Sequence, residues 1–155
     1  MKSEAARKLL NHAYFYLRFR ARTVYEMRIY LDKKAVSHKA TPEDIESVLQ
    51  ELQEMSLLDD RRFVQEYVAS RSRNKPRSRY ALTRELLRKG VDHSVISAFF
   101  TEAGIDEEQL ARTALQKVWG RYHRLEFLQK QKRATDYLRR RGFSFSVIQK
   151  VIKAM

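Results

Sequence analysis

Apolar residues recur at helical spacing along almost the whole chain. One stripe, spaced i, i+1, i+4 and i+5, consists of Phe63, Val64, Tyr67 and Val68. Asp59 can cap this helix at its start, and Asn74 and Pro76 end it. No stretch alternates apolar and polar residues over the length of a strand, and 4 glycines and 2 prolines allow few tight turns. The pattern therefore predicts an all-α protein.

A second helix follows after a short turn. Ser78 can cap its start, and Leu82, Leu86 and Leu87 are expected to face inward. Gly90 follows the last periodic residue and can take the left-handed conformation that ends many helices. Two helices joined by a polar turn are thus predicted for residues 59–90.

The chain also repeats itself. Met27–Val36, Leu82–Val91 and Ala134–Phe143 align without gaps, and the alignment sets Ala35 opposite Gly90 and Gly142. Four extra residues follow in the first copy. Beyond them the potential N-caps of the next helices also align, and these are Thr41, Asp92 and Ser144.

One more amphipathic helix precedes each copy, so the predicted architecture is three consecutive three-helix units with nine helices. The expected units are residues 1–57, 58–104 and 105–155, with Gly104 ending one helix and Asp106 capping the next. Each unit is too small to be very stable alone, because a short chain buries little apolar surface. We therefore expect tandem repeats that lean on their neighbours in an elongated, curved molecule.

Positive charge is the main feature of the composition. The chain has 32 Lys and Arg against 19 Asp and Glu, which gives a net charge of +13. The excess of cations is +2 for residues 1–57, +4 for 58–104 and +7 for 105–155. Such an imbalance favours a polyanionic partner.

No cysteine is present, so disulfides and thiolate chemistry are excluded. No apolar run approaches the roughly 20 residues that span a bilayer, and the N-terminal residues lack an apolar signal core. We expect a cytoplasmic protein without a membrane partner.

Two basic clusters are the candidate binding residues. The first spans the turn between the two helices described above and contains no acid; it comprises Arg71, Arg73, Lys75, Arg77 and Arg79. The second comprises Lys130, Lys132, Arg133, Arg139, Arg140 and Arg141. Side chains fanned from a turn can reach several phosphates at once, whereas the alternative is a solvated loop. The overall charge favours binding, although Arg141 also suits a helix C-terminus for structural reasons.

Aromatic residues alternate with cations in residues 14–20. Tyr14, Phe15 and Phe19 could stack on the bases of a single strand, but burial against neighbouring helices is the preferred interpretation. Trp119 is likewise expected to pack between units.

No catalytic or metal-binding motif is found. A Gly-rich phosphate loop, His-Glu-x-x-His and Gly-x-Ser-x-Gly are all absent. The four histidines, at positions 12, 38, 93 and 123, lack metal-ligand spacing, and the pair Asp59-Asp60 suits helix capping better than a metal. We expect neither an enzyme nor a cofactor.

Four segments together resemble a known family. They are Leu-Leu-Asp-Asp-Arg-Arg-Phe at 57–63, Tyr-Val-Ala-Ser-Arg at 67–71, Arg-Glu-Leu-Leu-Arg-Lys-Gly-Val at 84–91, and Tyr-Leu-Arg-Arg-Arg-Gly-Phe-Ser at 137–144. In this order and at this separation they are similar to the RecX family of bacterial regulatory proteins, which modulate the RecA recombinase. Many members have glycines in the basic turn where this chain has residues 74–78 without one, so the loop conformation is not carried over.

The resemblance implies a tandem three-helix-repeat protein that lodges in the groove of RecA filaments on DNA. Such a protein blocks filament extension or promotes disassembly, and so lowers ATPase, strand-exchange and co-protease activity in DNA repair and the SOS response. It also implies binding to single- and double-stranded DNA, and we expect a monomer. RecA as a partner rests on the resemblance alone.

Two other classes remain open. A helix-turn-helix-type nucleic-acid-binding protein would expose several Arg, Asn or Gln residues on one face of one unit, whereas here cations recur in all three units. A pure protein adaptor would have no DNA affinity of its own, which a binding assay at low and high salt distinguishes.

Overall fold

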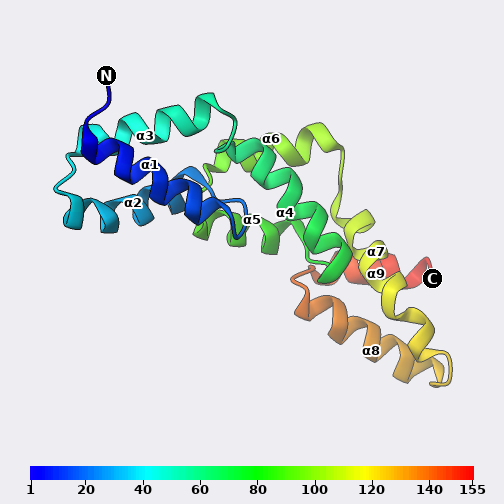
Figure 1. Cartoon of the computed structure of the whole chain (residues 1–155). Helices are drawn as coiled ribbons and strands as arrows, with labels where there is room; N and C mark the ends of the chain where they lie inside the picture. Colours follow the sequence, from blue (N-terminus) through cyan, green and yellow to red (C-terminus); the bar gives the residue numbers. More distant parts are fainter. The chain divides into compact units, whose positions relative to one another are not determined.

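Helices account for all the regular structure of the chain in a computed structural model that describes residues 1–155. The elements in order are α1 Glu4–Leu17, α2 Val24–His38, α3 Pro42–Glu54, α4 Asp60–Asn74, α5 Arg79–Arg88, α6 His93–Ala103, α7 Glu107–Trp119, the 3-10 turn η1 Gly120–Tyr122, α8 Phe127–Arg140 and α9 Phe145–Lys153 (Figure 1). The all-α class and the nine helices are confirmed. None of the helices combines the length and the apolar character that crossing a membrane requires.

The aligned N-caps of the repeat are confirmed. The Thr41 hydroxyl accepts a hydrogen bond from the Asp44 amide at 3.2 Å, and the Asp92 carboxylate accepts one from the Ser94 amide at 2.8 Å. The Ser144 hydroxyl lies 3.4 Å from the Val147 amide. Each cap satisfies an amide that has no partner within its own helix, which is why polar residues stand at these positions.

The helix ends agree with the repeat in two copies and depart from it in one. Gly90 and Gly142 both have positive φ, +81° and +93°, just after the ends of α5 and α8. Ala35 lies inside α2, and the left-handed residue there is Lys39 with φ 51°. The four extra residues of the first copy extend α2 by about one turn. The alignment of Ala35 with a helix end is therefore wrong.

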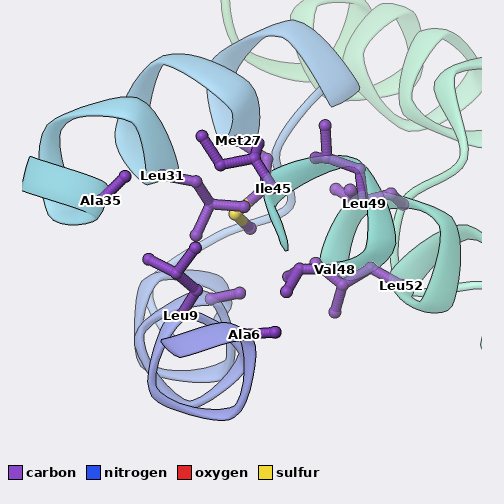
Figure 2. Packing of buried hydrophobic residues seen from close by; sticks show 11 residues of the cluster. Ala6, Leu9, Met27, Leu31, Ala35, Ile45, Val48, Leu49 and Leu52 are labelled. Carbon is purple, nitrogen blue, oxygen red and sulfur yellow. The ribbon is translucent and has the colours of Figure 1, made fainter. Parts of the chain in front are cut away.

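Contacts divide the chain into two compact units, and the first consists of Met1–Phe63 with Leu87–Val95. Helices α1, α2 and α3 pack against one another around a common apolar core. Figure 2 shows its side chains converging between the three helices. The buried residues are Ala6, Leu9, Ala13, Met27, Leu31, Ala35, Ile45, Val48, Leu49, Leu52 and Leu58.

Residues 87–95 are held within this first unit by polar and steric contacts at the start of α2. The buried Thr23 hydroxyl donates to the Lys89 carbonyl at 2.6 Å, and the Lys89 ammonium lies 3.6 Å from Glu26. Gly90 lies so close to Tyr25 that a Cβ at residue 90 would overlap the tyrosine side chain. Glycine is thus required at this position both by φ and by space.

The second compact unit consists of Val64–Leu86 with Ile96–Met155. Its core lies among α7, α8 and α9, which contact one another in all three pairs. The buried residues of this core are Ala111, Ala114, Leu115, Val118, Ala134, Tyr137, Leu138, Phe143, Ile148 and Val151. The division into three units of sequence repeat, with borders near residues 57 and 105, remains a prediction.

One predicted core position is wrong. Leu82 and Leu86 are buried, four residues apart on one face of α5, but Leu87 is 43% exposed. A residue one position further along a helix points about 100° away, so Leu87 leaves the buried face.

The three glycines with positive φ predict a graded response to alanine. Gly104→Ala should cost about 1–2 kcal/mol from backbone strain alone, because nothing lies within 4 Å of the added Cβ. Gly90→Ala should cost about 1–3 kcal/mol more, because the Cβ overlaps Tyr25. Gly142→Ala should fall between the two, since its Cβ would lie 2.7 Å from the Ser78 hydroxyl oxygen and 3.0 Å from the Ala81 Cβ. Thermal unfolding followed by circular dichroism gives the order, and equal losses in all three variants would contradict it.

Glu26 predicts an acid-sensitive contribution to stability. Burial alone would raise the pKa of Glu26, but hydrogen bonds from Arg20 and Thr23 and the charges of Arg20 and Lys89 hold its pKa below the ordinary value. A depressed carboxyl pKa stabilises the fold above the unfolded-state pKa, and that stabilisation is lost as pH falls through the lower folded value. Glu26→Gln should therefore be less stable than the parent near pH 7, with the difference vanishing as pH falls below about 4. Urea unfolding across this range measures it, and a constant difference at every pH would disprove the assignment.

Candidate nucleic-acid interface

The first basic cluster is divided between a helix end and a turn. Helix α4 continues through Asn74, so Arg71 and Arg73 belong to its last turn. The Lys75 amide still donates to the Arg71 carbonyl at 2.8 Å, and the helix ends because Pro76 has no amide hydrogen to donate. The predicted end at Asn74 and Pro76 is confirmed, and the turn between the helices is only residues 75–78.

Ser78 anchors the far side of this turn. Its side chain is fully buried, and its hydroxyl accepts a hydrogen bond from the Ala81 amide at 3.0 Å, which confirms it as the cap of α5. Its own amide donates to the Arg141 carbonyl at 3.0 Å. Gly142 lies directly against Ser78 and Ala81, where no side chain fits. The start of α5 and the end of α8 are therefore in contact through their backbones.

This contact brings parts of the two basic clusters together. Arg139 and Arg140 end α8, Arg141 caps it, and Arg77 and Arg79 flank Ser78. Residues about 60 positions apart in the chain are thus brought next to each other at the pair Ser78 and Arg141. The repeat alone could not show this proximity, because it aligns residues 139–141 with residues 87–89 and not with the turn at Ser78.

Glu85 pairs with two arginines of the first cluster. Its carboxylate lies 3.3 Å from Arg71 Nε and 3.0 Å from Arg77 Nε. The Tyr67 hydroxyl donates to the same carboxylate at 2.5 Å and accepts from Arg71 at 3.0 Å. Burial and the hydrogen bond to Glu85 raise the pKa of Tyr67. The hydrogen bond between Arg71 and Tyr67 raises the pKa of Arg71 as well. One acid on α5 thereby ties the end of α4 to the turn.

Arg79 and the start of α5 have further partners in α6 and α7. The Arg79 guanidinium lies 5.0 Å from the centre of the Phe100 ring, a cation–π contact. The Glu107 carboxylate accepts hydrogen bonds from the Arg79 and Tyr80 amides, which oppose the burial that raises the pKa of Glu107. An acid at a helix N-terminus is favoured by the helix dipole. These contacts leave Arg73 and Lys75 as the exposed cations of the first cluster.

The cations in the first half of α8 point in two directions. Arg133 and Asp136 line two shallow hollows. Lys132 lines the first, and Arg121 and Arg140 line the second, which lies nearer the end of the helix and has a volume of about 320 Å³. Lys130 instead places its ammonium 4.2 Å from the centre of the Trp119 ring. Arg121 is not recognisable from the sequence because it lies outside both basic clusters, and only the fold places it near Arg133 and Arg140.

A lysine of α7 supports the same region. The Lys117 ammonium donates to the carbonyl oxygens of Ser72 at 2.6 Å and Arg73 at 2.5 Å, near the C-terminal end of α4. Carbonyls in the last turn of a helix lack internal partners, and a cation there also favours the helix dipole. The last turn of α4, with Arg71 and Arg73, is thus held from a second helix.

The expected burial of three aromatic residues near the N-terminus is wrong, and Tyr14 is 36% exposed. Phe15 and Phe19 are 53% and 68% exposed and contact each other edge to face at 5.2 Å between ring centres. Tyr16, between them in the chain, instead stacks on Tyr30 at 4.0 Å. Trp119 is half-buried and packs against the core of α7, α8 and α9.

The acidic pair and the histidines have structural partners. Asp59 accepts from the Arg62 amide at 3.2 Å, which confirms it as the cap of α4, and Asp60 accepts from the Val24 amide at 3.1 Å. His12 and His38, 26 positions apart in the sequence, are neighbours in the fold, with their Nε2 atoms 2.9 Å apart. No three side chains of His, Cys, Asp or Glu gather so as to hold a metal ion.

Two family models match this chain. The one described as the second three-helix domain of RecX matches residues 59–98, and the one described as the third three-helix domain of RecX matches residues 106–152. Together they cover both basic clusters and the backbone contact between Ser78 and Arg141.

Whole proteins of the same description match over most of the chain. The regulatory protein RecX of Prosthecochloris aestuarii is 31% identical over 157 residues, covering 98% of this chain and 96% of its own. That of Chlorobaculum tepidum is 32% identical over 149 residues, covering 93% and 86%. The crystal structure of RecX from Lactobacillus salivarius superposes with a TM-score of 0.76 at 22% identity, covering 97% and 96%. That last likeness shows a shared fold and agrees with tandem helical repeats.

Glu85→Gln should strengthen DNA binding that depends on charge. Removing the carboxylate leaves Arg71 and Arg77 without their ion-pair partner, so both can neutralise phosphates. If both do so on single-stranded DNA, the slope of log affinity against log salt should become steeper by about 1.4. The matched control is Glu43→Gln, which removes the same charge from the exposed first turn of α3 and should leave the slope unchanged. Equal slopes for the parent and both variants would show that Glu85 does not restrain these arginines.

Proposed function

Because the chain belongs to the RecX family of regulatory proteins, we propose that it regulates the RecA recombinase by binding RecA filaments on DNA. It limits filament extension and thereby lowers ATP hydrolysis, strand exchange and co-protease activity in DNA repair and the SOS response. In this proposal it acts by binding, as a monomer, without a catalytic site or a cofactor.

The observation that carries the DNA-binding part is the contact between Ser78 and Arg141. It brings the end of α4 and the following turn, which carry Arg73, Lys75 and Arg77, next to the end of α8. In this proposal these side chains and those of Arg139 and Arg140 form one phosphate-binding surface. Lys132 and Arg133 extend this surface along α8 by about 10 Å, at a rise of 1.5 Å per residue. A surface of this kind contacts several phosphates and does not read bases, so it suits sequence-independent binding to single- and double-stranded DNA.

Arginine makes up most of this surface, and that choice suits a filament with two kinds of acidic group. A guanidinium forms paired hydrogen bonds with phosphate and with carboxylate, whereas a lysine ammonium is a point charge. Arg71 and Arg77 already form ion pairs with a carboxylate inside the chain, that of Glu85. The same residues can therefore meet DNA or an acidic protein surface of the filament.

The test of the function is DNA-dependent ATP hydrolysis by the RecA of the same organism, with this protein titrated in. We expect the rate to fall as the protein is added and the fall to be larger when filaments are still extending. An unchanged rate at every ratio of the two proteins would contradict the proposed function.

A paired variant tests the assigned surface. Arg73→Ala with Arg140→Ala removes two exposed cations, so on single-stranded DNA the slope of log affinity against log salt should become shallower by about 1.4. Inhibition of RecA should weaken in parallel. The control is Arg7→Ala with Lys33→Ala, which removes two exposed cations from α1 and α2. If both pairs change the slope equally, net charge alone is responsible; circular dichroism checks that every variant is folded.

A further inference from the structure

An open pocket of about 440 Å³ lies among the end of α7, the start of α8 and the end of α9. Its apolar lining is formed by Trp119, Phe127, Ile152 and Met155, and its cations are Lys130 and Lys153. All of these residues belong to the second compact unit, and most come from helices that share the core of α7, α8 and α9. Its volume falls in the range of pockets that hold a ligand.

Two large apolar side chains are exposed at the start of α8, and the first of them lines the pocket. Phe127 is 72% exposed and Leu128 is 76% exposed, at consecutive positions in the first turn. Exposing large apolar side chains to water is unfavourable. Two neighbouring exposed apolar side chains beside a pocket therefore favour an interaction site. No residue of the charged surface near Ser78 lines this pocket.

We propose that this pocket binds an amphipathic segment of a protein partner that carries apolar anchor residues flanked by carboxylates. The anchors enter between Trp119, Phe127 and Met155, and the carboxylates meet Lys130 and Lys153. Helices with spaced apolar anchors bind grooves in this way. Lys130 therefore belongs to a protein-binding site, whereas Lys132, two residues later on the same helix, belongs to the phosphate-binding surface.

Charge and shape favour a protein segment over a nucleic acid. The pocket contains no arginine, and the Lys130 ammonium lies 4.2 Å from the centre of the Trp119 ring, so a base would have to displace this lysine to stack on that face. The two lysines set a positive rim around an apolar floor, which is complementary to an acidic and apolar peptide. Met155 adds a flexible side chain that adapts to such anchors.

Binding to a filament requires a contact with protein as well as with DNA, and this pocket is a site for that contact. Only the identity of the partner rests on the proposed function. The test can therefore be made without RecA. Trp119 is the only tryptophan of the chain, so its fluorescence reports occupation of the pocket directly.

The probe is a synthetic helical peptide with leucines at i, i+3, i+4 and i+7 and glutamates on its other faces. We expect a saturable change in Trp119 emission with this peptide. Two control peptides, with lysines in place of the glutamates or alanines in place of the leucines, should produce no saturable change. If the acidic peptide gives none, or the lysine peptide binds equally well, the proposal is overturned.

Two surface variants of the protein locate the site. Lys130→Glu should weaken binding of the acidic peptide by about tenfold through charge reversal at the rim. Phe127→Ala should also weaken it by about tenfold, and because this side chain is exposed the fold should survive. Lys132→Glu is the matched control, which should reduce DNA affinity and leave peptide affinity within about twofold. Equal effects of Lys130→Glu and Lys132→Glu on the peptide would overturn the assignment.

The other possible occupants give distinct results. Emission that changes with the concentration of the protein alone would identify a second copy of this chain, and competition of an oligothymidylate with the peptide would identify nucleic acid; either result overturns the proposal. RecA inhibition is then measured separately with Phe127→Ala. Peptide binding by a protein that leaves RecA unaffected would support the pocket and reject the proposed function, whereas full RecA inhibition by Phe127→Ala would show that inhibition does not use the pocket.

Discussion

The hydrogen bond from the Ser78 amide to the Arg141 carbonyl is the contact on which the basic surface depends. It forms because Gly142 has no side chain, so the end of α8 can approach the start of α5. The buried hydroxyl of Ser78 meanwhile satisfies the Ala81 amide, and Glu107 satisfies the Arg79 and Tyr80 amides. A glycine, a serine and an acid from three segments thus bring two sets of arginines together without leaving the first amides of α5 unpaired.

Cations that lie close together repel one another, and only a few acidic side chains in this region offset that repulsion. Glu85 accepts contacts from Arg71 and Arg77, while Arg79 lies over an aromatic ring. The remaining cations, such as Arg73 and Lys75, stay in water, where repulsion is weak. The arrangement restrains some arginines and leaves others available, which is suited to a surface that must hold its shape before its partner arrives.

Helix α8 separates two kinds of surface. Lys132, Arg133 and Arg140 lie on its charged side, and Lys130 with Phe127 belongs to an apolar pocket beside Trp119. The proposed binding to a filament of protein and DNA needs contacts of both kinds, because phosphate contacts give affinity without selecting the protein. The separation along one helix allows each kind to be changed without disturbing the other.

The sequence by itself determined the elements, because caps and helix ends are local. Asp59, Thr41 and Ser144 cap the expected helices, and Gly90 and Gly142 end two of them, since each satisfies groups only a few residues away. The family segments were equally legible. Tertiary structure alone decided that Ser78 meets Arg141, that Glu85 pairs with Arg71 and Arg77, that Arg121 lies near Arg133, and that Phe15 and Phe19 are exposed. Helical periodicity assigns residues to a face of their own helix, but which neighbour covers that face depends on the packing of segments distant in the chain.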